Sequence, residues 1–442
     1  MILKKLGVLL FLMLFGCYFT AEAKQFDAEE FFLDNGLHVV VIKNHKAPIV
    51  KQMIFYKVGA TDELPGKGGI AHLLEHLMFR GTKRVKGQEF NRIAEQNGME
   101  SNAFTSQDVT AYHQFVDVSR LELAMFLEAD RMQNLAINEN DFITERDIVF
   151  QERKQRVDNS PVAKFFETVN KTLWQEHPYA NPVTGYDTEI LNLTPKDAID
   201  FYKRYYVPNN AVLVLSGDID VETAKKMADK YYGKLKTMEK IQTKFELKKG
   251  MYKAKAEMST SDVKMERFVK MFVAPSFVQN KKQAYALEII AEYMGGNENS
   301  PLYQKMVVRD KTALNISVYY DGIARSYGKF VISAIPVSDN TDVFEKKIDR
   351  AWNDALKNFD ENDLKEIKQR LKINLIYLKD NPESLAQTVG WMLAVGMNLD
   401  DLQQYVEEVD KITLSDVFGV ADYLWNEAHQ AIGVLHPEEI KQ

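Results

Sequence analysis

The sequence predicts an α+β protein made of two loosely related halves, each with a mostly antiparallel sheet and packed helices. The tripeptide Asp34-Asn35-Gly36 separates two apolar runs, which is a hairpin signal and predicts antiparallel strands near the start of the chain. Helical periodicity follows these strands. The second half repeats this order loosely, and its closing apolar run at 431–435 is the counterpart of the run at 212–215.

Length and composition agree with a globular protein of this class. The chain has 442 residues, of which 45% are hydrophobic, so it can bury a sizeable core. The formal net charge is −7, and both signs are mixed along the chain. A nucleic-acid-binding protein needs a basic face, so we expect no nucleic-acid partner.

Residues 1–23 are predicted to form a secretory signal peptide. A basic start precedes an apolar run at 6–15 that is too short to span a bilayer as a helix, and Ala21-Glu22-Ala23 supplies a small-residue cleavage site. The single cysteine, Cys17, follows Leu14-Phe15-Gly16, which in a bacterium resembles a lipoprotein box. Two alternatives stay open, cleavage after Ala23 and a lipid anchor at Cys17. Both predict an exported, periplasmic protein, soluble or lipid-anchored, without an intrachain disulfide.

The first half is predicted to span residues 24–235, and its elements follow from local patterns. We expect adjacent strands at 37–42 and 49–58, a β-hairpin from 99–105 and 112–116, and a buried strand at 211–215. Helices are expected at 68–79, 88–96, 121–132 and 141–156, and another begins at Pro195 with Thr194 as its cap. A Lys-rich linker at 236–250 then leads to the second half at 251–442.

The helix at 68–79 carries the candidate site. His72 and His76 lie one turn apart with Glu75 between them, opposite a face made of aliphatic residues. Imidazoles at i and i+4 can reach one metal ion, and the carboxylate between them could take a proton from a water molecule at that ion. The alternative is a surface helix with two solvated histidines. The apolar opposite face, the Gly-rich start and a carboxylate-bearing helix downstream favour the metal site.

That downstream helix, at 141–156, presents Glu145 and Glu152 on a face shared with Ile148 and Val149. Partly buried carboxylates need a cation or hydrogen-bond donors beside them, and a metal ion with its histidines would supply both. The alternative is that Glu152 pairs with Arg156 at i+4 while Glu145 points to water.

These motifs resemble those of a known family. The run Gly59-Ala60-Thr61-Asp62-Glu63, the motif His72-Leu73-Leu74-Glu75-His76 and the following Phe79-Arg80-Gly81-Thr82 resemble the pitrilysin/insulinase family of zinc metallopeptidases, which carry an inverted zinc motif. The resemblance covers almost the whole mature chain and is strongest from 33 to 218. It implies two related α+β halves that face each other across a cavity, with zinc in only one of them.

The resemblance also implies a role for each candidate residue. His72, His76 and Glu152 would hold one Zn²⁺ per chain, and Glu75 would activate the water that hydrolyses a peptide bond. Glu145 would orient a ligand histidine. An extended peptide would add as a strand along Asn102 and Ala103.

One departure from the family pattern concerns the second half. In the family, a segment like 300–309 carries an Arg, matched here by Arg309, and a Tyr seven residues later, where this chain has Ile316. Both side chains reach the substrate or the oxyanion in the family. Tyr320 shares the strand parity of Ile316 but lies about 13 Å further along. One hypothesis is a heterodimer in which a homologue supplies the missing Tyr. The alternatives are a different donor or lower activity from one chain alone, and a homodimer stays open as well.

The resulting hypothesis is a zinc-dependent endopeptidase that hydrolyses peptides or unfolded polypeptide segments. One alternative is a non-catalytic or partner-dependent subunit of a heteromeric assembly like a processing peptidase, and another is a peptide-binding carrier. The complete set of His72, Glu75, His76 and Glu152 favours the enzyme, because a scaffold has no reason to keep it.

Overall fold

The structure of the protein is a computed structural model that describes residues 25–87, 89–239, 245–247, 250–337 and 341–438. The predicted signal peptide with Cys17, and part of the predicted linker at 236–250, lie outside these residues. No helix within the described ranges combines the length and the hydropathy that crossing a membrane requires.

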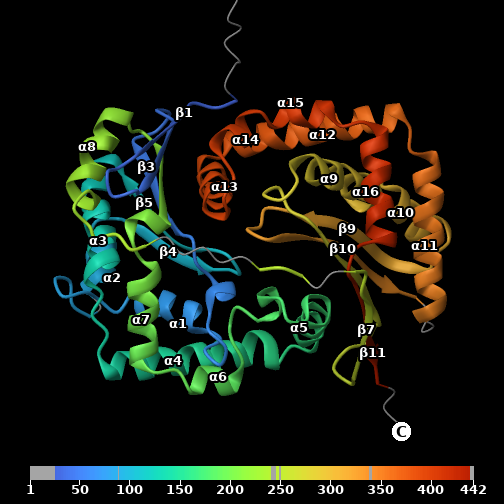
Figure 1. Cartoon of the computed structure of the whole chain (residues 1–442), viewed down its shortest axis with the longest axis horizontal. Helices are drawn as coiled ribbons and strands as arrows, with labels where there is room; N and C mark the ends of the chain where they lie inside the picture. The colour runs from blue at the N-terminus through green and yellow to red at the C-terminus, as the bar shows by residue number, and fades with distance from the viewer. Residues whose placement is uncertain (1–24, 88, 240–244, 248–249, 338–340, 439–442) are drawn as a thin grey trace, which may run out of the picture.

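The strands form two sheets with the same connectivity (Figure 1). The first sheet has six strands in the order β1-β2-β6-β3-β5-β4, and the second has five in the order β7-β11-β8-β10-β9. In the first sheet β6 pairs parallel with β2 and antiparallel with β3. In the second sheet β11 pairs in the same way, parallel with β7 and antiparallel with β8. The strands are β1 (Ala28–Phe32), β2 (His38–Lys43), β3 (Ile49–Tyr56), β4 (Glu100–Thr105), β5 (Thr110–Asp117), β6 (Ala211–Gly217), β7 (Lys253–Thr260), β8 (Arg267–Pro275), β9 (Ala313–Asp321), β10 (Tyr327–Pro336) and β11 (Gln430–Pro437).

This correspondence confirms the α+β class and the two related halves. The predicted hairpin around Gly36 joins β1 to β2, and Gly36 has the positive φ of 82° that such a turn demands. The expectation that β2 and β3 are adjacent was wrong, because β6 lies between them. Every residue of β6 is buried, and its central place supplies backbone partners along both of its edges.

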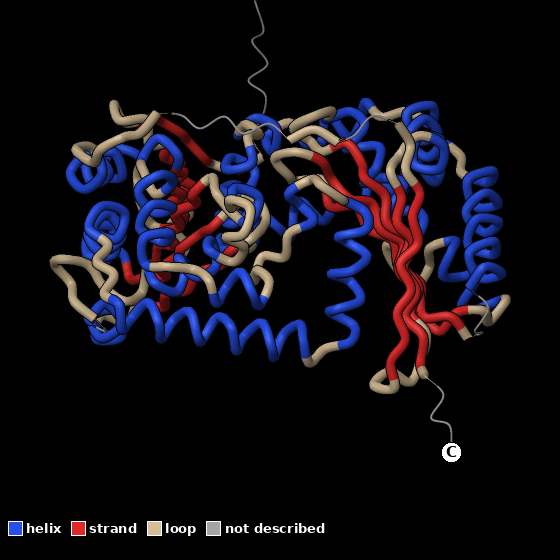
Figure 2. Tube along the Cα trace, turned by 60° about the horizontal axis from the view of Figure 1, so that its bottom comes forward, coloured by secondary structure: helices blue, strands red, loops and turns tan. Residues whose placement is uncertain are grey.

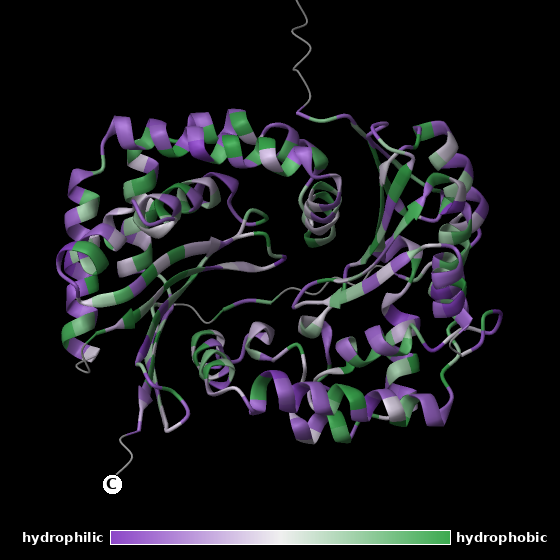
Figure 3. Cartoon of the chain, turned by 180° about the vertical axis from the view of Figure 1, so that it is seen from behind, coloured by the Kyte–Doolittle hydropathy of each residue, from purple (hydrophilic) through white to green (hydrophobic). Residues whose placement is uncertain are grey.

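The helices pack around the two sheets. Figure 3 shows that the outer helices mix hydrophilic and hydrophobic residues, as expected for helices with one face on a core. The longer ones are α1 (Ile70–Leu77), α2 (Glu89–Gln96), α3 (Leu121–Asn134), α4 (Glu139–Arg153), α5 (Pro161–Trp174), α7 (Pro195–Tyr205), α8 (Val221–Tyr232), α9 (Lys281–Gly295), α11 (Thr341–Asn358), α12 (Glu361–Asp380), α13 (Pro382–Val395) and α16 (Leu414–Asn426). Shorter helices are α6 (Asp187–Leu191), α10 (Pro301–Tyr303), α14 (Leu399–Gln403) and α15 (Tyr405–Lys411).

Successive side chains of a β-strand point to opposite faces of the sheet, so those of the first sheet alternate between two cores. On β2, Val39 and Val41 pack with α1, α3, α4, α7 and α8 of the same half. Val40 and Ile42 face the other way, into a core that includes α13 of the second half. Each face of the sheet is therefore covered by helices, but one of the covering helices comes from the far end of the chain.

The exchange of helices is reciprocal. Figure 2 shows α4 running from the first half toward the middle of the molecule, after which α5 lies beside the second sheet. Phe165 and Val169 of α5 share a core with β8 and β11. Two glycines permit these close contacts. A Cβ on Gly433 of β11 would lie 2.2 Å from Val169, and a Cβ on Gly390 of α13 would lie 2.0 Å from the ring of Phe55 on β3. The two halves are thus interlocked.

A polar cluster also joins the halves. Arg325, in the turn between β9 and β10, forms an ion pair with Asp62 of the first half. The backbone N–H of Arg325 donates to Oδ2 of Asp108 at 2.9 Å, and the hydroxyl of Tyr179 donates to the same oxygen at 2.5 Å. The hairpin of the second half is therefore fixed against the segments that flank β4 and α1.

Candidate functional site

The start of α1 is stabilised by a buried carboxylate. Gly69 adopts a φ of 85°, which favours glycine, and its N–H donates to Glu63 at 3.0 Å. The N–H of Ala71 donates to the other oxygen of Glu63, also at 3.0 Å. Burial raises the pKa of Glu63 well above its ordinary value, and these two hydrogen bonds oppose that rise. Glu63 thereby satisfies two of the free N–H groups at the beginning of α1 and sets the direction of the helix.

The opposite faces of α1 are as predicted. The aliphatic residues Ile70, Leu73, Leu74 and Leu77 are all buried at 2% exposure or less. The imidazoles of His72 and His76 lie on the other face, with ring centroids 4.9 Å apart.

Glu152 of α4 meets both imidazoles. Its Oε2 lies 3.7 Å from Nε2 of His72, and its Oε1 lies 3.8 Å from Nε2 of His76. One ligand atom from each of His72, His76 and Glu152 can be chosen so that all three lie within 4.8 Å of one another. Two imidazole nitrogens and one carboxylate oxygen are a donor set that zinc accepts in catalytic sites.

The surroundings of Glu152 fit a cation. Its Oε2 is buried and accepts no hydrogen bond from any described residue, although Nη2 of Arg156 lies 3.2 Å away. The predicted alternative, an ion pair with Arg156 at i+4, is therefore present as well. The Arg156 side chain is 64% exposed, whereas the Glu152 carboxylate faces both imidazoles. The ion pair with Arg156 therefore leaves a place for a cation between His72, His76 and Glu152.

Glu145 lies seven residues before Glu152 and contacts the Nδ1 side of the His76 ring, opposite the nitrogen that faces Glu152. Its Oε2 lies 2.9 Å from Nδ1 of His76, and its other oxygen pairs with Arg80. Burial raises the pKa of Glu145, but the hydrogen bonds from His76 and Arg80 outweigh burial and hold it below its ordinary value. An ionised Glu145 keeps the proton of His76 on Nδ1, so that Nε2 is free to bind a metal.

The two histidines differ in their electrostatics. Burial lowers the pKa of His72 to about 3, so this imidazole stays neutral. Burial also lowers the pKa of His76, but the hydrogen bond with Glu145 and the charges of Glu152 and Glu75 outweigh it and raise the pKa overall.

Glu75 faces a pocket beside the histidines. Burial raises its pKa, while the hydroxyl of Thr105, at the end of β4, donates to its Oε2 at 2.6 Å. A small cavity of about 310 Å³ lies against Glu75, His76, Arg80 and Glu145. A carboxylate with a raised pKa beside a metal-type donor set is suited to accept and return protons.

The predicted substrate strand is an exposed edge. β4 is the last strand of its sheet and pairs only with β5 in the described structure. Asn102 is exposed, and its Oδ1 accepts the N–H of Ala103 at 2.9 Å. That N–H is therefore not used by β5 and is open to exchange for a carbonyl of an added strand.

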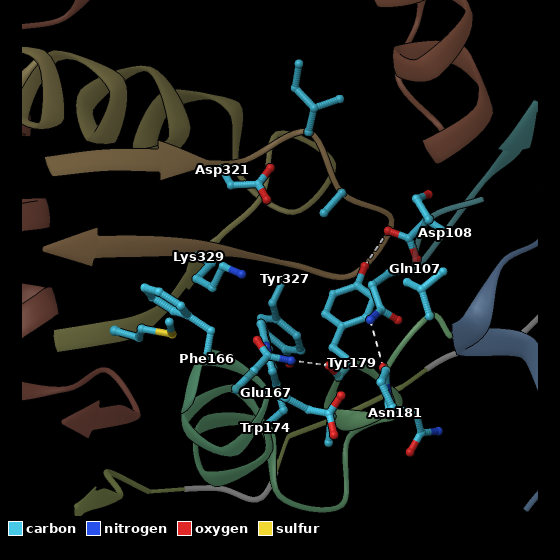
Figure 4. Close-up of a pocket in the computed structure, with 18 of the residues that line it drawn as sticks. Gln107, Asp108, Phe166, Glu167, Trp174, Tyr179, Asn181, Asp321, Tyr327 and Lys329 are labelled. Atoms are coloured by element: carbon cyan, nitrogen blue, oxygen red, sulfur yellow. Dashed lines mark hydrogen bonds between the residues drawn. The ribbon is translucent and has the colours of Figure 1, made fainter. Parts of the chain in front are cut away.

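A cavity of about 580 Å³ continues from the end of β4 into the space between the halves (Figure 4). Thr105, whose hydroxyl donates to Glu75, lines this cavity. The first half contributes residues after β4 and the rings of Phe166 and Trp174 on α5, and the second half contributes Tyr319 of β9, residues of β10, and Trp391 of α13.

The structure changes the interpretation of the departure at Ile316. Ile316 is 2% exposed and belongs to the core of the second half, on the face of β9 that packs against α9. A Tyr at this position would point into that core, so Ile316 is not a gap in the cavity wall. Tyr320 is no substitute, because its hydroxyl donates to the carbonyl of Pro275. Tyr319, on the opposite face of β9, is the tyrosine of this strand that lines the cavity.

Arg309 is exposed, on a π-helical turn before β9, and does not line either of these two cavities. Its predicted role toward substrate stays a prediction.

Sequence reasoning did not identify Thr105, Arg80 or Glu63 as partners of the site. All three stand inside the segments that carry the family resemblance, which is the signal that could have found them.

Comparisons with known proteins match two parts of the chain to family models. Residues 38–187 match the family described as Insulinase (Peptidase family M16), and residues 192–371 match the Peptidase M16 inactive domain. The first match contains the whole donor set, and the second begins before β6 and covers much of the second half.

Individual relatives point to the same family. The zinc protease PqqE of Helicobacter pylori is 32% identical over 289 residues, which is 64% of this chain and 65% of that protein. The β subunit of the mitochondrial-processing peptidase of Neurospora crassa is 23% identical over 91% of this chain and 87% of its own length. A crystal structure of a protease from Helicobacter pylori superposes with a TM-score of 0.84 at 28% identity, covering 93% of this chain and all of that one. The chain therefore belongs to the insulinase family, peptidase family M16, and is a pitrilysin/insulinase-family protein of the zinc metallopeptidase type.

Proposed function

We propose that the protein is a zinc-dependent endopeptidase that hydrolyses peptides or unfolded polypeptide segments. The observation that carries this proposal is the convergence of His72, His76 and Glu152, from two separate helices, next to the carboxylate of Glu75. Membership of a zinc protease family supports it.

His72, His76 and Glu152 would hold one zinc ion. When bound, zinc acts as a Lewis acid, lowers the pKa of water and polarises a carbonyl group. The remaining steps belong to the protein. Glu145 holds His76 in the tautomer that leaves Nε2 unprotonated, and burial keeps His72 neutral.

Glu75 is the proposed general base. Its raised pKa lets it remove a proton from the attacking water and later pass that proton to the leaving amine. Thr105 holds the carboxylate in place through its 2.6 Å hydrogen bond. Because Thr105 ends β4, the same residue couples the base to the strand along which the peptide would lie.

The proposed substrate binds as an added strand along Asn102 and Ala103. The route onward leads into the cavity between the interlocked halves, whose volume of about 580 Å³ suits a few extended residues. A folded domain is about 30 Å across and cannot enter such a space. Peptides and unfolded segments are therefore the proposed substrates.

Export to the bacterial periplasm is part of the proposal and rests on the signal-like pattern at 1–23. Mass spectrometry of the mature protein tests it, because cleavage after Ala23 leaves Lys24 at the N-terminus whereas a lipid anchor leaves an acylated Cys17.

A partner-dependent subunit is the second candidate. Its support is the similarity to a relative that is itself named as a subunit of a processing peptidase, together with the position of Arg309 away from both cavities. In that case a homologue or a second copy would complete the site.

The deciding experiment measures the zinc content of the purified protein and its cleavage of a peptide library, with and without 1,10-phenanthroline. Cleavage that the chelator abolishes and added zinc restores is the expected result. Peptide capture without cleavage, unaffected by chelator, would identify a carrier instead. A gain in turnover only on mixing with a homologous chain would favour the partner-dependent subunit.

A further inference from the structure

The charged residues of the large cavity differ in how they are neutralised. Glu167 receives hydrogen bonds from Nη1 and Nη2 of Arg153, both at 3.0 Å. Asp108 accepts from the backbone of Arg325 and from Tyr179. These two carboxylates are therefore satisfied by the protein itself and hold the walls of the cavity in place.

Lys329 of β10 is different. Among the cavity-lining residues that the structure describes, it has the one cationic side chain. Figure 4 shows this side chain directed into the cavity, with Phe166 and Tyr327 nearby. Asp321 of β9 is its cross-strand neighbour and influences it through charge, but no ion pair or hydrogen bond to the Lys329 ammonium is found within the described ranges. The Lys329 side chain is half-buried, and burial lowers its pKa.

We propose that Lys329 is a specificity-determining residue that binds an acidic side chain of the peptide substrate. This inference rests on the proposed peptidase function and names the class of segment that the enzyme prefers.

A half-buried ammonium without a direct partner has lost part of its hydration, and an anionic group entering the cavity restores that interaction as a charge-assisted hydrogen bond. The aromatic rings of Phe166, Trp174 and Trp391 exclude water and lower the local dielectric constant, which strengthens the attraction. A neutral side chain at the same place would leave the ammonium uncompensated.

The cavity is also placed to select residues close to the reacting bond. It begins at Thr105, which contacts Glu75, and it extends to Lys329 on the opposite half. An extended peptide has a fixed rise of about 3.3 Å per residue, so a peptide that passes Thr105 brings one particular residue to Lys329. The acidic preference should therefore appear at one fixed position.

Binding is tested first, without any need for cleavage. Fluorescence anisotropy measures how tightly the zinc-loaded Glu75→Gln protein binds labelled peptides. The peptides are compared in pairs that differ only by Glu or Gln at one position, and this position is moved along the peptide from pair to pair. We expect at least one position where the Glu peptide binds about tenfold tighter. Adding Lys329→Gln should remove this difference, and Lys329→Glu should reverse it in favour of a Lys peptide.

The control is Lys346→Gln, which removes an exposed lysine of α11 that does not line the cavity, and it should keep the preference. If no position shows a Glu preference, or if Lys329→Gln keeps it, the proposal is wrong. If the Glu75→Gln protein prefers basic peptides, the selectivity belongs to Asp321 and the proposal is also wrong. Cleavage profiling of the protein with Glu75 intact then tests the peptidase function separately, because binding can be selective even where no bond is cut.

Discussion

Arg325 donates one hydrogen bond to each carboxylate oxygen of Asp62, from Nη1 at 3.1 Å and from Nη2 at 2.9 Å. The two residues are 263 positions apart in the chain, and each belongs to a different half. The Asp62 side chain is 1% exposed and also accepts the N–H of Gly59 at 3.0 Å. This bidentate pair fastens the β9–β10 hairpin to the segment that leads into α1, and thus it holds one wall of the cavity against the candidate site.

Replacing Arg325 by Met should destabilise the fold strongly. The substitution leaves Asp62 buried without its cation, and breaking one side of a buried ion pair costs about 3–5 kcal/mol in the free energy of unfolding. Urea denaturation followed by circular dichroism measures this. The exposed Arg350→Met provides the control and should change the free energy by less than about 0.5 kcal/mol. Equal effects of the two variants would contradict the structural role of the pair.

Gly390 of α13 and Gly419 of α16 should respond oppositely to replacement by alanine. A Cβ at Gly390 would lie 2.0 Å from the Phe55 ring of the other half, so the variant must shift α13 or the ring, at about 1–3 kcal/mol. A Cβ at Gly419 of α16 would meet no other part of the described structure within 4 Å, and alanine should stabilise the helix by about 0.5–1 kcal/mol. Thermal unfolding of both variants measures the signs. A neutral Gly390→Ala would show that α13 does not pack closely on the first sheet.

Glu75→Gln should keep zinc and lose activity. Glutamine preserves the size of the side chain and can still meet Thr105, but it cannot accept a proton, so turnover should fall about 10²–10⁴-fold. Metal analysis and steady-state cleavage of a peptide measure the two properties in parallel. Normal cleavage by this variant would refute the proposed mechanism.

Glu145→Gln should weaken zinc binding rather than the chemistry alone. The variant removes the negative charge that orients His76 and leaves Arg80 without its partner. Loss of such a supporting group costs about 10–100-fold in metal affinity. Competition with a chelator of known affinity at constant pH measures the change. Glu139→Gln, at the exposed start of the same helix, should bind zinc as the unmodified protein does.

Glu288 of α9 should make stability depend on pH. It adjoins a cavity of about 200 Å³ in the second half, and burial raises its pKa from 4.5 to about 7, partly opposed by a 3.0 Å hydrogen bond from the Tyr405 hydroxyl. Because the folded pKa lies above the unfolded one, the contribution of Glu288 to stability is fully present below pH 4.5 and is lost as the pH rises through 7.

The loss amounts to at most about 3.4 kcal/mol, at 1.36 kcal/mol per pKa unit. Glu288→Gln stays neutral at every pH, and so its free energy of unfolding should exceed that of the unmodified protein more at pH 8 than at pH 5. Urea denaturation at the two pH values measures the difference. A difference between the two proteins that does not change with pH would show that Glu288 ionises normally in the folded state.

Local patterns in the sequence predicted much of the candidate site. The face of α1 follows from helical geometry within one segment, and so the spacing of His72, Glu75 and His76 correctly predicts how these three side chains lie relative to one another. The hairpin of β4 and β5 and the Thr194 cap of α7 follow from neighbouring residues in the same way. The meeting of Glu152 with the histidines needed the family resemblance, because no local rule joins two helices.

The sequence by itself determined the helices α1 and α4, which carry the donor residues, and the repeated strands. The periodicity of each of these elements depends only on residues close together in the chain. Only the tertiary structure decided that β6 separates β2 from β3, that Ile316 faces a core, and that Lys329 faces the cavity. The physical reason is that these outcomes depend on which faces of the two sheets are covered. That choice is made by α5 and α13, each of which packs on the sheet of the other half.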